Sequence, residues 1–355
     1  MVTIPTLYGR DIEELLQPQG ERRQLLDGFD ADYVDIVDYI IRCTHRIWEQ
    51  KDLGLIETHY GQDMLIHTPA GPLFGMAGAI GGTARTLSGF PDRTLIGEAV
   101  IWSGDERQGY HSSHRIISNA SNLGPSEFGP PTGRKVTFTT IADCLCLRNE
   151  IIEEWLVRDN SHIALQLGFS PRSIAREQAR KDREESSSPQ SWRTDHIERI
   201  EAVTATPFPD LHHPDPHAEP EAFAYWYFDV LWNHRRFTAV RDIYSPAAHW
   251  SGPSGRRLFG WGEVTGWLAG WIGSFSTARF AVDHVGSVEE PDCTDIAVRW
   301  SMTGKHDGPA LYGAPSQHNV YVLGITHWRV REARIVEETT VIDDIALLRQ
   351  IEGGL

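Results

Sequence analysis

Residues 149–168 read NEIIEEWLVRDNSHIALQLG, and residues 333–352 read ARIVEETTVIDDIALLRQIE. The two stretches align without a gap at an offset of 184 residues and share an Ile, a Glu-Glu pair, a Val, an Asp and a Gln at matching places. Chance does not keep one register over such a length. The chain is therefore predicted to contain one domain twice.

The same offset extends the match outward from these stretches. It superposes further pairs of residues: Trp48 and Trp232, Tyr60 and Tyr244, Pro69 and Pro253, Gly71 and Gly255, Arg115 and Arg299, Gly129 and Gly313. Between the copies the sequence is charged and rich in Ser and Pro, which is typical of a linker. We predict an N-terminal extension (1–29), a first domain (30–170), a linker (171–218) with a solvated helix over 172–186, and a second domain (219–355).

Each copy is predicted to place helices first and strands last. Apolar residues at helical spacing indicate helices over 32–50 and 53–60, then a short strand over 64–67 and a Gly-rich helix or loop over 75–90. Alternating patterns indicate strands over 94–103, 109–119, 134–147 and 150–160. The predicted fold class is α+β, with a curved antiparallel sheet packed on the N-terminal helices as a cone around a cavity.

Composition narrows the classes of function. The 355 residues carry a formal net charge of −16, which repels nucleic acid and anionic membranes, and no apolar run is long enough to span a membrane. The acidic start of the chain does not resemble a signal peptide, so we expect a cytoplasmic protein. The cysteines are expected to be buried free thiols. Nucleotide-binding and zinc motifs are missing, so we predict neither cofactor nor metal.

A family resemblance rests on the closing pattern 149–168, on His67-Thr68-Pro69-Ala70-Gly71 and on residues 128–134 (FGPPTGR). These motifs and the element order resemble the SnoaL-like polyketide cyclases of the nuclear-transport-factor-two-like (NTF2-like) superfamily, over residues 30–169 and more weakly over 219–355. The resemblance implies a small-molecule substrate. It also implies domains that pair through their sheets, so that the copies form an intramolecular pseudo-dimer, with a further homo-oligomer left open.

Asp159 is the predicted general acid/base. In SnoaL-like cyclases an acidic residue on a pocket-lining strand has this role, and Asp159 is the position that best matches it. A carboxylate beside Trp155 in an apolar cone would have a raised pKa, which suits proton transfer. The alternative is that Asp159 caps the helix that follows, because Asp-Asn before an apolar run is also a helix start.

His114 is the predicted partner of Asp159. It shares a strand face with Ser112 and Ile116, and the matching positions of the second copy are apolar: Ile296, Val298 and Trp300. This face is therefore expected to point inward. An inward His pairs well with an acid, although a core histidine whose hydrogen bonds are satisfied is the usual explanation.

Three further residues of the first copy are predicted to bind substrate: His67 at the mouth of the cone, Trp155, and Tyr60, whose recurrence as Tyr244 also favours a structural role. A second acid/base candidate is the pair of Asp143 and Glu154. They would face each other across the hairpin if its turn, Arg148-Asn149, has two residues.

The second copy keeps an acid as Asp343 but replaces Trp155 by Thr339 and His114 by Val298. It adds His249 and His327 as candidate site residues, together with many tryptophans. The simplest interpretation is one working site in the first copy and a structural role for the second. The rival interpretation is two pockets with different ligands.

The predicted function is that of a cofactor-independent enzyme, a lyase or isomerase. It would act on a small organic molecule by general acid/base proton transfer, in a cyclisation of aldol type, an isomerisation or a dehydration. The alternative from another class is a non-catalytic module for ligand binding or assembly.

Overall fold

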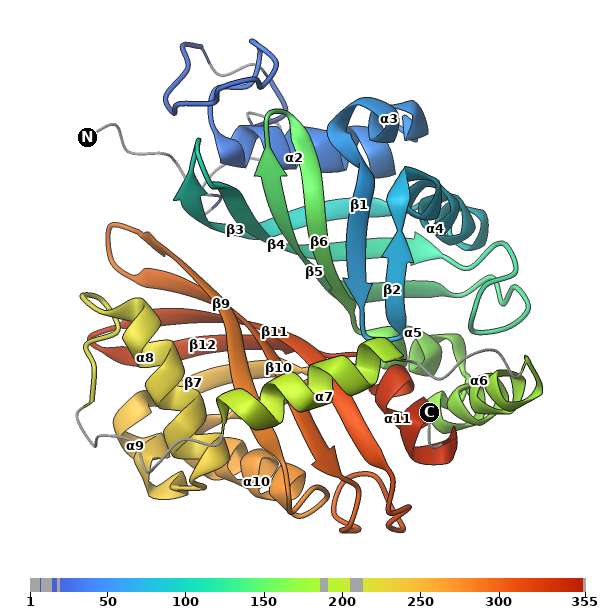
Figure 1. Cartoon of the computed structure of the whole chain (residues 1–355), viewed down its shortest axis with the longest axis vertical. Helices are drawn as coiled ribbons and strands as arrows, with labels where there is room; N and C mark the ends of the chain where they lie inside the picture. Colours follow the sequence, from blue (N-terminus) through green and yellow to red (C-terminus); the bar gives the residue numbers. More distant parts are fainter. Residues whose placement is uncertain (1–6, 8–14, 18–19, 186–190, 205–212, 354–355) are drawn as a thin grey trace. The chain divides into compact units, whose positions relative to one another are not determined.

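A computed structural model describes residue 7 and residues 15–17, 20–185, 191–204 and 213–353 (Figure 1). The chain divides into two compact units. The first runs to Arg158 and includes Ile163–Gly168, and the second holds Asp159–His162 and the chain from Phe169 onward. We call these units the first and the second copy. No helix of the described residues is long and apolar enough to cross a membrane.

The described part of the first copy is built in the predicted order of helices and then strands. Its elements are α2 (Ile36–Trp48), a 3-10 turn (Leu53–Leu55), α3 (Ile56–His59), β1 (Tyr60–Thr68), β2 (Gly71–Phe74), α4 (Gly75–Gly89), β3 (Thr94–Asp105), β4 (Gly109–Ser121), β5 (Lys135–Leu147) and β6 (Glu150–Arg158), with α5 (Asn160–Leu167) following. The strands form one sheet in the order β2-β1-β6-β5-β4-β3. Only the β1–β6 pair is parallel among these strands.

The second copy repeats this plan, which confirms the duplication and the α+β fold class. Its described elements are α8 (Pro220–Tyr227), a π-helical turn (Phe228–Asn233), 3-10 turns (Phe237–Ala239 and Pro253–Gly255), α9 (Val240–Ile243), β7 (Tyr244–Gly252), β8 (Arg256–Phe259), α10 (Gly260–Ile272), β9 (Arg279–Glu289), β10 (Thr294–Lys305), β11 (Asn319–Arg331), β12 (Arg334–Val341) and α11 (Asp344–Gly353). The strand order is β8-β7-β12-β11-β10-β9, the same as in the first copy.

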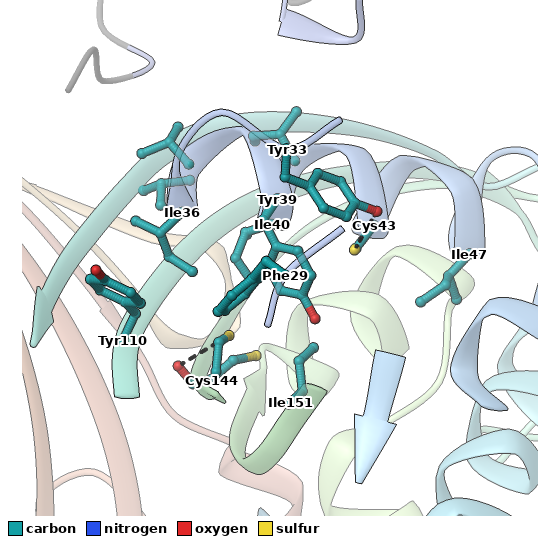
Figure 2. Close-up of a cluster of buried hydrophobic side chains, with 14 of the residues drawn as sticks. Phe29, Tyr33, Ile36, Tyr39, Ile40, Cys43, Ile47, Tyr110, Cys144 and Ile151 are labelled. Carbon is teal, nitrogen blue, oxygen red and sulfur yellow. Dashed lines mark hydrogen bonds between the residues drawn. The ribbon is translucent and has the colours of Figure 1, made fainter. Parts of the chain in front are cut away.

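The core of the first copy lies between α2 and one face of the sheet. Asp35 caps α2 by accepting a hydrogen bond from Asp38 N at 2.8 Å, and apolar residues at helical spacing, such as Ile36 and Ile40, are buried. They pack against Cys144 and Ile151 of the sheet (Figure 2). We call the face of each sheet that meets these helices the inner face and the opposite face the outer face. All four cysteines are buried and free, as predicted.

A β-bulge sets the register of the last strand in both copies. Leu147 pairs with Glu150 and Cys146 with Ile151, but Leu145 then pairs with Glu153, so residue 152 is extra. The second copy has the same shift, between the pairs Val330–Ile335 and Arg329–Glu337. A bulged residue opposes no partner, and the pairing beyond it moves by one residue.

The bulge overturns the predicted pairing of Asp143 with Glu154. The turn has two residues, Arg148 and Asn149, both with positive φ as a type I′ turn requires. Because of the extra residue, however, Glu154 pairs with Cys144, and Asp143 pairs with Trp155. Asp143 and Glu154 therefore lie on opposite faces of the sheet.

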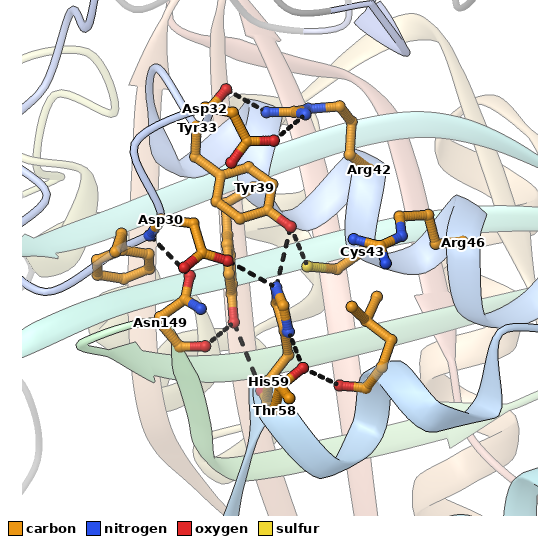
Figure 3. A network of polar contacts seen from close by, with 12 residues as sticks. Asp30, Asp32, Tyr33, Tyr39, Arg42, Cys43, Arg46, Thr58, His59 and Asn149 are labelled. Carbon is orange, nitrogen blue, oxygen red and sulfur yellow. Dashed lines mark hydrogen bonds and ion pairs between the residues drawn. The ribbon is translucent and has the colours of Figure 1, made fainter.

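A polar network fastens residues 30–39 to α3 and to the β5–β6 turn (Figure 3). Tyr33 Oη lies 3.0 Å from His59 Nε2, and His59 Nδ1 lies 2.8 Å from the hydroxyl of Thr58. Tyr39 Oη donates to the carbonyl of Asn149 at 2.9 Å. Burial lowers the pKa of His59, so this histidine serves as a neutral link in the core.

The range predicted as a linker contains two helices, α6 (Pro171–Glu185) and α7 (Ser191–Val203), and both belong to the second copy. α6 packs on α11 through Ala175 and Ala179, which are fully buried. α7 packs on β9 and β10, where Arg199 forms an ion pair with Asp283 at 2.8 Å. Residues 186–190 and 205–212 of this range lie outside the described residues.

Candidate functional site

Buried polar side chains gather on the inner face of the first copy, and four of them concern the candidate site. They are Ser112 and His114 on β4, Thr140 on β5 and Glu154 on β6, and each is at most 6% exposed. Across the sheet Glu154 pairs with Cys144, which pairs with Ser112. Since directly paired residues point to the same side of a sheet, these side chains enter the same core as Cys144.

Three of these side chains lack hydrogen-bond partners among the described residues. They are Ser112 through its Oγ, Thr140 through its Oγ1, and His114 through both ring nitrogens. Leaving a buried polar group unpaired costs about 1–3 kcal/mol, so unpaired groups are uncommon in folded proteins. Several unpaired groups on one face make this face the candidate site of the first copy.

Glu154 is the acid of this face. No other described residue forms a hydrogen bond or an ion pair with its carboxylate, and burial raises its pKa from 4.5 to about 7. Burial also lowers the pKa of His114 to about 3. Near neutral pH, Glu154 therefore exchanges a proton readily while His114 stays uncharged.

A buried cation lies on the same face. Nε and Nη2 of Arg93 donate to the hydroxyl of Ser118 at 3.0 and 2.9 Å, and the guanidinium lies 4.3 Å from the ring centre of Trp48. No described carboxylate forms an ion pair with it. Burial and the charge of Arg158 lower the pKa of Arg93 to about 9. Arg93 therefore adds positive charge to the inner face of the first copy.

The second copy holds its equivalent acid, Glu338, in a different way. Among the described residues four neutral donors reach its carboxylate: Tyr244 Oη, Trp250 Nε1 at 2.7 Å, Trp328 Nε1 at 3.0 Å and Thr340 Oγ1 at 2.8 Å. Burial raises the pKa of Glu338, and the hydrogen bonds oppose this rise. An ionised carboxylate has about four acceptor positions, so those of Glu338 are filled.

The first copy lacks three of these four donors. Tyr60 stands in place of Tyr244, but Ile66, Cys144 and Leu156 occupy the strand positions of Trp250, Trp328 and Thr340, and none is a comparable donor. Burial, and after it the charge of Glu154, raise the pKa of Tyr60 well above its ordinary value.

Asp159 is placed as the cap of α5, the alternative that its sequence context offered. Its carboxylate accepts hydrogen bonds from Ser161 Oγ at 2.7 Å and from His162 N, Ser254 N and Gly255 N, each at 3.0 Å. It follows the end of β6, and these bonds join it to the second copy, whereas His114 belongs to the first. The predicted pair is therefore not brought together by these contacts.

His67 and Trp155 lie on the outer face and not on the face of Glu154. His67 Nε2 is 2.7 Å from Glu153 Oε1, and its ring stacks on Trp155 with centres 4.9 Å apart. Tyr60 is the one predicted substrate-binding residue that the structure places near Glu154.

The candidates of the second copy are spread over three places. Asp343 caps α11, accepting from Ile345 N at 2.9 Å and from Ala346 N at 3.2 Å. His249 is exposed, with its ring 5.0 Å from that of Phe259. His327 is buried on the outer face, since it precedes the inward Trp328. Within either copy taken alone, no three described His, Cys, Asp or Glu side chains come together as metal ligands.

From the sequence alone Asp159 is the first candidate for the acid/base, and the pair of Asp143 and Glu154 is the second. A signal for Glu154 was present, because a Glu-Glu pair recurs at 153–154 and 337–338 inside an apolar strand. Assigning the inner face to Glu154 also required the apolar alternation of β5, where Ala142, Cys144 and Cys146 share one face.

Comparison with known proteins finds a family model that resembles the second copy. Residues 223–351 match the family model described as SnoaL-like polyketide cyclase, and no curated protein matches the chain. Among solved structures, a candidate SnoaL-like polyketide cyclase from Jannaschia sp. CCS1 is 20% identical, with 41% of this chain and 98% of that chain covered and a TM-score of 0.35. IdmH from Streptomyces antibioticus, a candidate polyketide cyclase, is 23% identical (36% and 96% covered, TM-score 0.31). AclR from Streptomyces galilaeus, a candidate hydroxylase, is 19% identical (38% and 96% covered, TM-score 0.33).

Proposed function

We propose, from two tandem domains of the SnoaL-like fold, that the first copy catalyses proton transfer on a small organic molecule with Glu154 as general acid/base. One observation carries this proposal. Glu154 is a buried carboxylate without a described hydrogen-bond partner, its pKa is raised to about 7, and it shares a face with other unpaired polar groups. A base with a pKa near the working pH combines a useful ionised fraction with enough basicity.

The neighbouring side chains suit the other half of such a reaction. Ser112 and neutral His114 each carry a hydrogen that can be donated to the oxygen of a carbonyl as charge develops there. Ser112 is two strands away from Glu154, or about 10 Å, since neighbouring strands lie about 4.8 Å apart.

Three reaction types share this chemistry: cyclisation of aldol type, isomerisation and dehydration each begin by removing a proton next to a carbonyl or hydroxyl group. The family model matched by the second copy describes polyketide cyclases, which supports the cyclase type. The alternative of a non-catalytic binding module fits the second copy better, because the acceptor positions of Glu338 are filled.

The experiment measures deuterium exchange in ²H₂O, because proton abstraction is visible by NMR even when no product forms. A panel of small ketones and hydroxyketones is incubated with the wild-type chain, with Glu154→Gln and with Glu153→Gln. Glu153 is a matched control on the same strand with its side chain on the outer face. We expect exchange with wild type and Glu153→Gln and a loss of at least 100-fold with Glu154→Gln. Exchange that survives in Glu154→Gln would contradict the assignment.

A further inference from the structure

The inner face of the first copy is reached by solvent near the middle of the sheet. Ala142 of β5 and Leu156 of β6 pair with each other on two central strands, and both are only partly buried. Their counterparts at the 184-residue offset, Thr326 and Thr340, are buried in the second copy. A water-sized group therefore enters a space over Ala142 and Leu156, and this space is closed in the second copy.

Glu154 lies on one side of this space along the sheet, and Thr140 lies on the other. On β5 the inner face carries Thr140, Ala142 and then Cys144, which pairs with Glu154. Four residues of strand separate Thr140 from Cys144, or about 13 Å. Thr140 is buried, and its Oγ1 has no hydrogen-bond partner among the described residues. The space therefore lies between a proton acceptor and an unpaired hydroxyl.

Arg93 is the cation on the side of Thr140. Its guanidinium lies 4.3 Å from the ring centre of Trp48 and 5.3 Å from that of Phe138, which precedes Thr140 on the same face of β5. The rings attract the cation through its faces and leave the N–H groups at its edge to other partners. Nε and Nη2 donate to Ser118, but Nη1 forms no hydrogen bond with a described residue.

The charge of Arg93 is costly where it stands. Its side chain is 4% exposed, and no described carboxylate forms an ion pair with it. A buried charge is usually paired, because burial removes the water that would otherwise stabilise it. The pKa of Arg93, lowered to about 9 by burial and by the charge of Arg158, still leaves the guanidinium protonated near neutral pH. An anion bound at Nη1 would supply the missing counter-charge.

We propose that the first copy binds a carboxylic acid, with its carboxylate on Nη1 of Arg93 and Oγ1 of Thr140 and the rest of the molecule over Ala142 and Leu156. One cation and one hydroxyl suit a singly charged carboxylate, which accepts hydrogen bonds and donates none. This step rests on the proposed function for its position relative to Glu154. The reacting carbon then lies remote from the carboxylate, because Glu154 is about 13 Å farther along the sheet.

The test is calorimetric titration of the full chain with linear keto acids of increasing length, beginning with levulinate, and with the methyl ester of each acid. The ester keeps the ketone and the chain but removes the charge. We expect saturable binding of at least one acid and about tenfold weaker binding of its ester, since a hydrogen bond to a charged group is worth at least that factor. Equal binding of acid and ester, or no saturable binding of any acid, would overturn the proposal.

Variants locate the carboxylate. Arg93→Met keeps the length of the side chain and should make acid and ester bind equally, whereas Arg93→Lys should keep part of the preference for the acid. Arg115→Met is the control, since Arg115 lies on the outer face in an ion pair with Glu98, and it should behave as the wild type. A purely structural role of Arg93 would weaken acid and ester alike. If Arg93→Met does not fold, Thr140→Val decides, because an unchanged preference for the acid would then contradict the proposal.

Glu154→Gln separates this proposal from the proposed function. The variant should keep the preference for the acid while deuterium exchange is lost. If acids bind to the wild type through Arg93 but no keto compound exchanges deuterium, the base is refuted and the carboxylate site stands. If neutral ketones exchange deuterium through Glu154 and acids bind no better than esters, the carboxylate site is refuted and the base stands.

Discussion

The substitution Glu154→Gln is expected to abolish a pH-dependent loss of stability in the first copy. Burial raises the pKa of Glu154 from 4.5 to about 7, so the folded state holds this proton more tightly than the unfolded state. Between these pH values the folded state binds more protons, and stability must fall as the pH rises. The loss is absent below about pH 4.5 and complete above about pH 7.

The size of the effect follows from the two values. A tenfold change in ionisation equilibrium corresponds to about 1.4 kcal/mol, so ionising Glu154 costs the folded state on the order of 3 kcal/mol. Gln has a similar shape and does not ionise. Relative to the wild type, Glu154→Gln should therefore gain about 3 kcal/mol of unfolding free energy between pH 5 and pH 8.

The measurement is urea unfolding of the wild type, Glu154→Gln and Glu153→Gln at both pH values. Because a chain of two domains does not always unfold in one transition, hydrogen exchange of peptides from β4, β5 and β6 assigns the change to the first copy. Glu153→Gln should follow the wild type, since Glu153 lies on the outer face. If the wild type and Glu154→Gln respond to pH in parallel, the carboxyl has an ordinary pKa and the proposed base is lost.

Two further substitutions separate function from stability. His114→Val introduces the residue that the second copy has at this position, Val298, and removes a buried ring without described partners. Urea unfolding should show a gain of about 1–3 kcal/mol in unfolding free energy. Deuterium exchange into substrate should fall. Asp159→Ala removes the cap of α5 and its four hydrogen bonds, and should cost about 2 kcal/mol by the same measurement. An Asp159→Asn variant that keeps its stability but loses exchange activity would instead restore Asp159 as the acid/base.

The fold could be predicted from the sequence because the patterns that indicate it are either local or present twice. The 184-residue offset identified the duplication, and alternation located all four long strands of the first copy to within two residues at each end. The Arg148-Asn149 turn was also correct. Turns and alternation depend on neighbouring residues alone, so one sequence contains the information.

The site residues could not be predicted in the same way, because their positions depend on how neighbouring strands pair and on which face of the sheet meets the helices. Alternation divided β6 into two sets of side chains but did not say which set meets the helices. The bulge at residue 152 then shifted the pairing by one residue, which separated Glu154 from Asp143. A bulge without a glycine leaves no mark in the sequence that alternation could detect.

The predicted linker shows a different limit. α6 has a strongly charged sequence, and among its side chains with described burial only Ala175 and Ala179 are buried. Alanine contributes little to an apolar pattern, yet its small size lets α6 approach α11 closely. A helix that packs through alanines therefore resembles a solvated helix in sequence.

The two copies keep a Glu at the same position but differ in the polar side chains around it. Where the first copy places Ser112 and His114 on the inner face, the second has Ile296 and Val298; where the second places the donors Trp250, Trp328 and Thr340, the first has Ile66, Cys144 and Leu156. Donors that favour the ionised form suit a fixed charge, and their removal suits a base that must take up and release a proton. A chain that needed either cone only for packing would gain stability by replacing its acid with an apolar residue, since a buried carboxylate is costly in both environments. The presence of Glu154 and Glu338 in such different surroundings therefore supports two distinct roles, with proton transfer confined to the first copy.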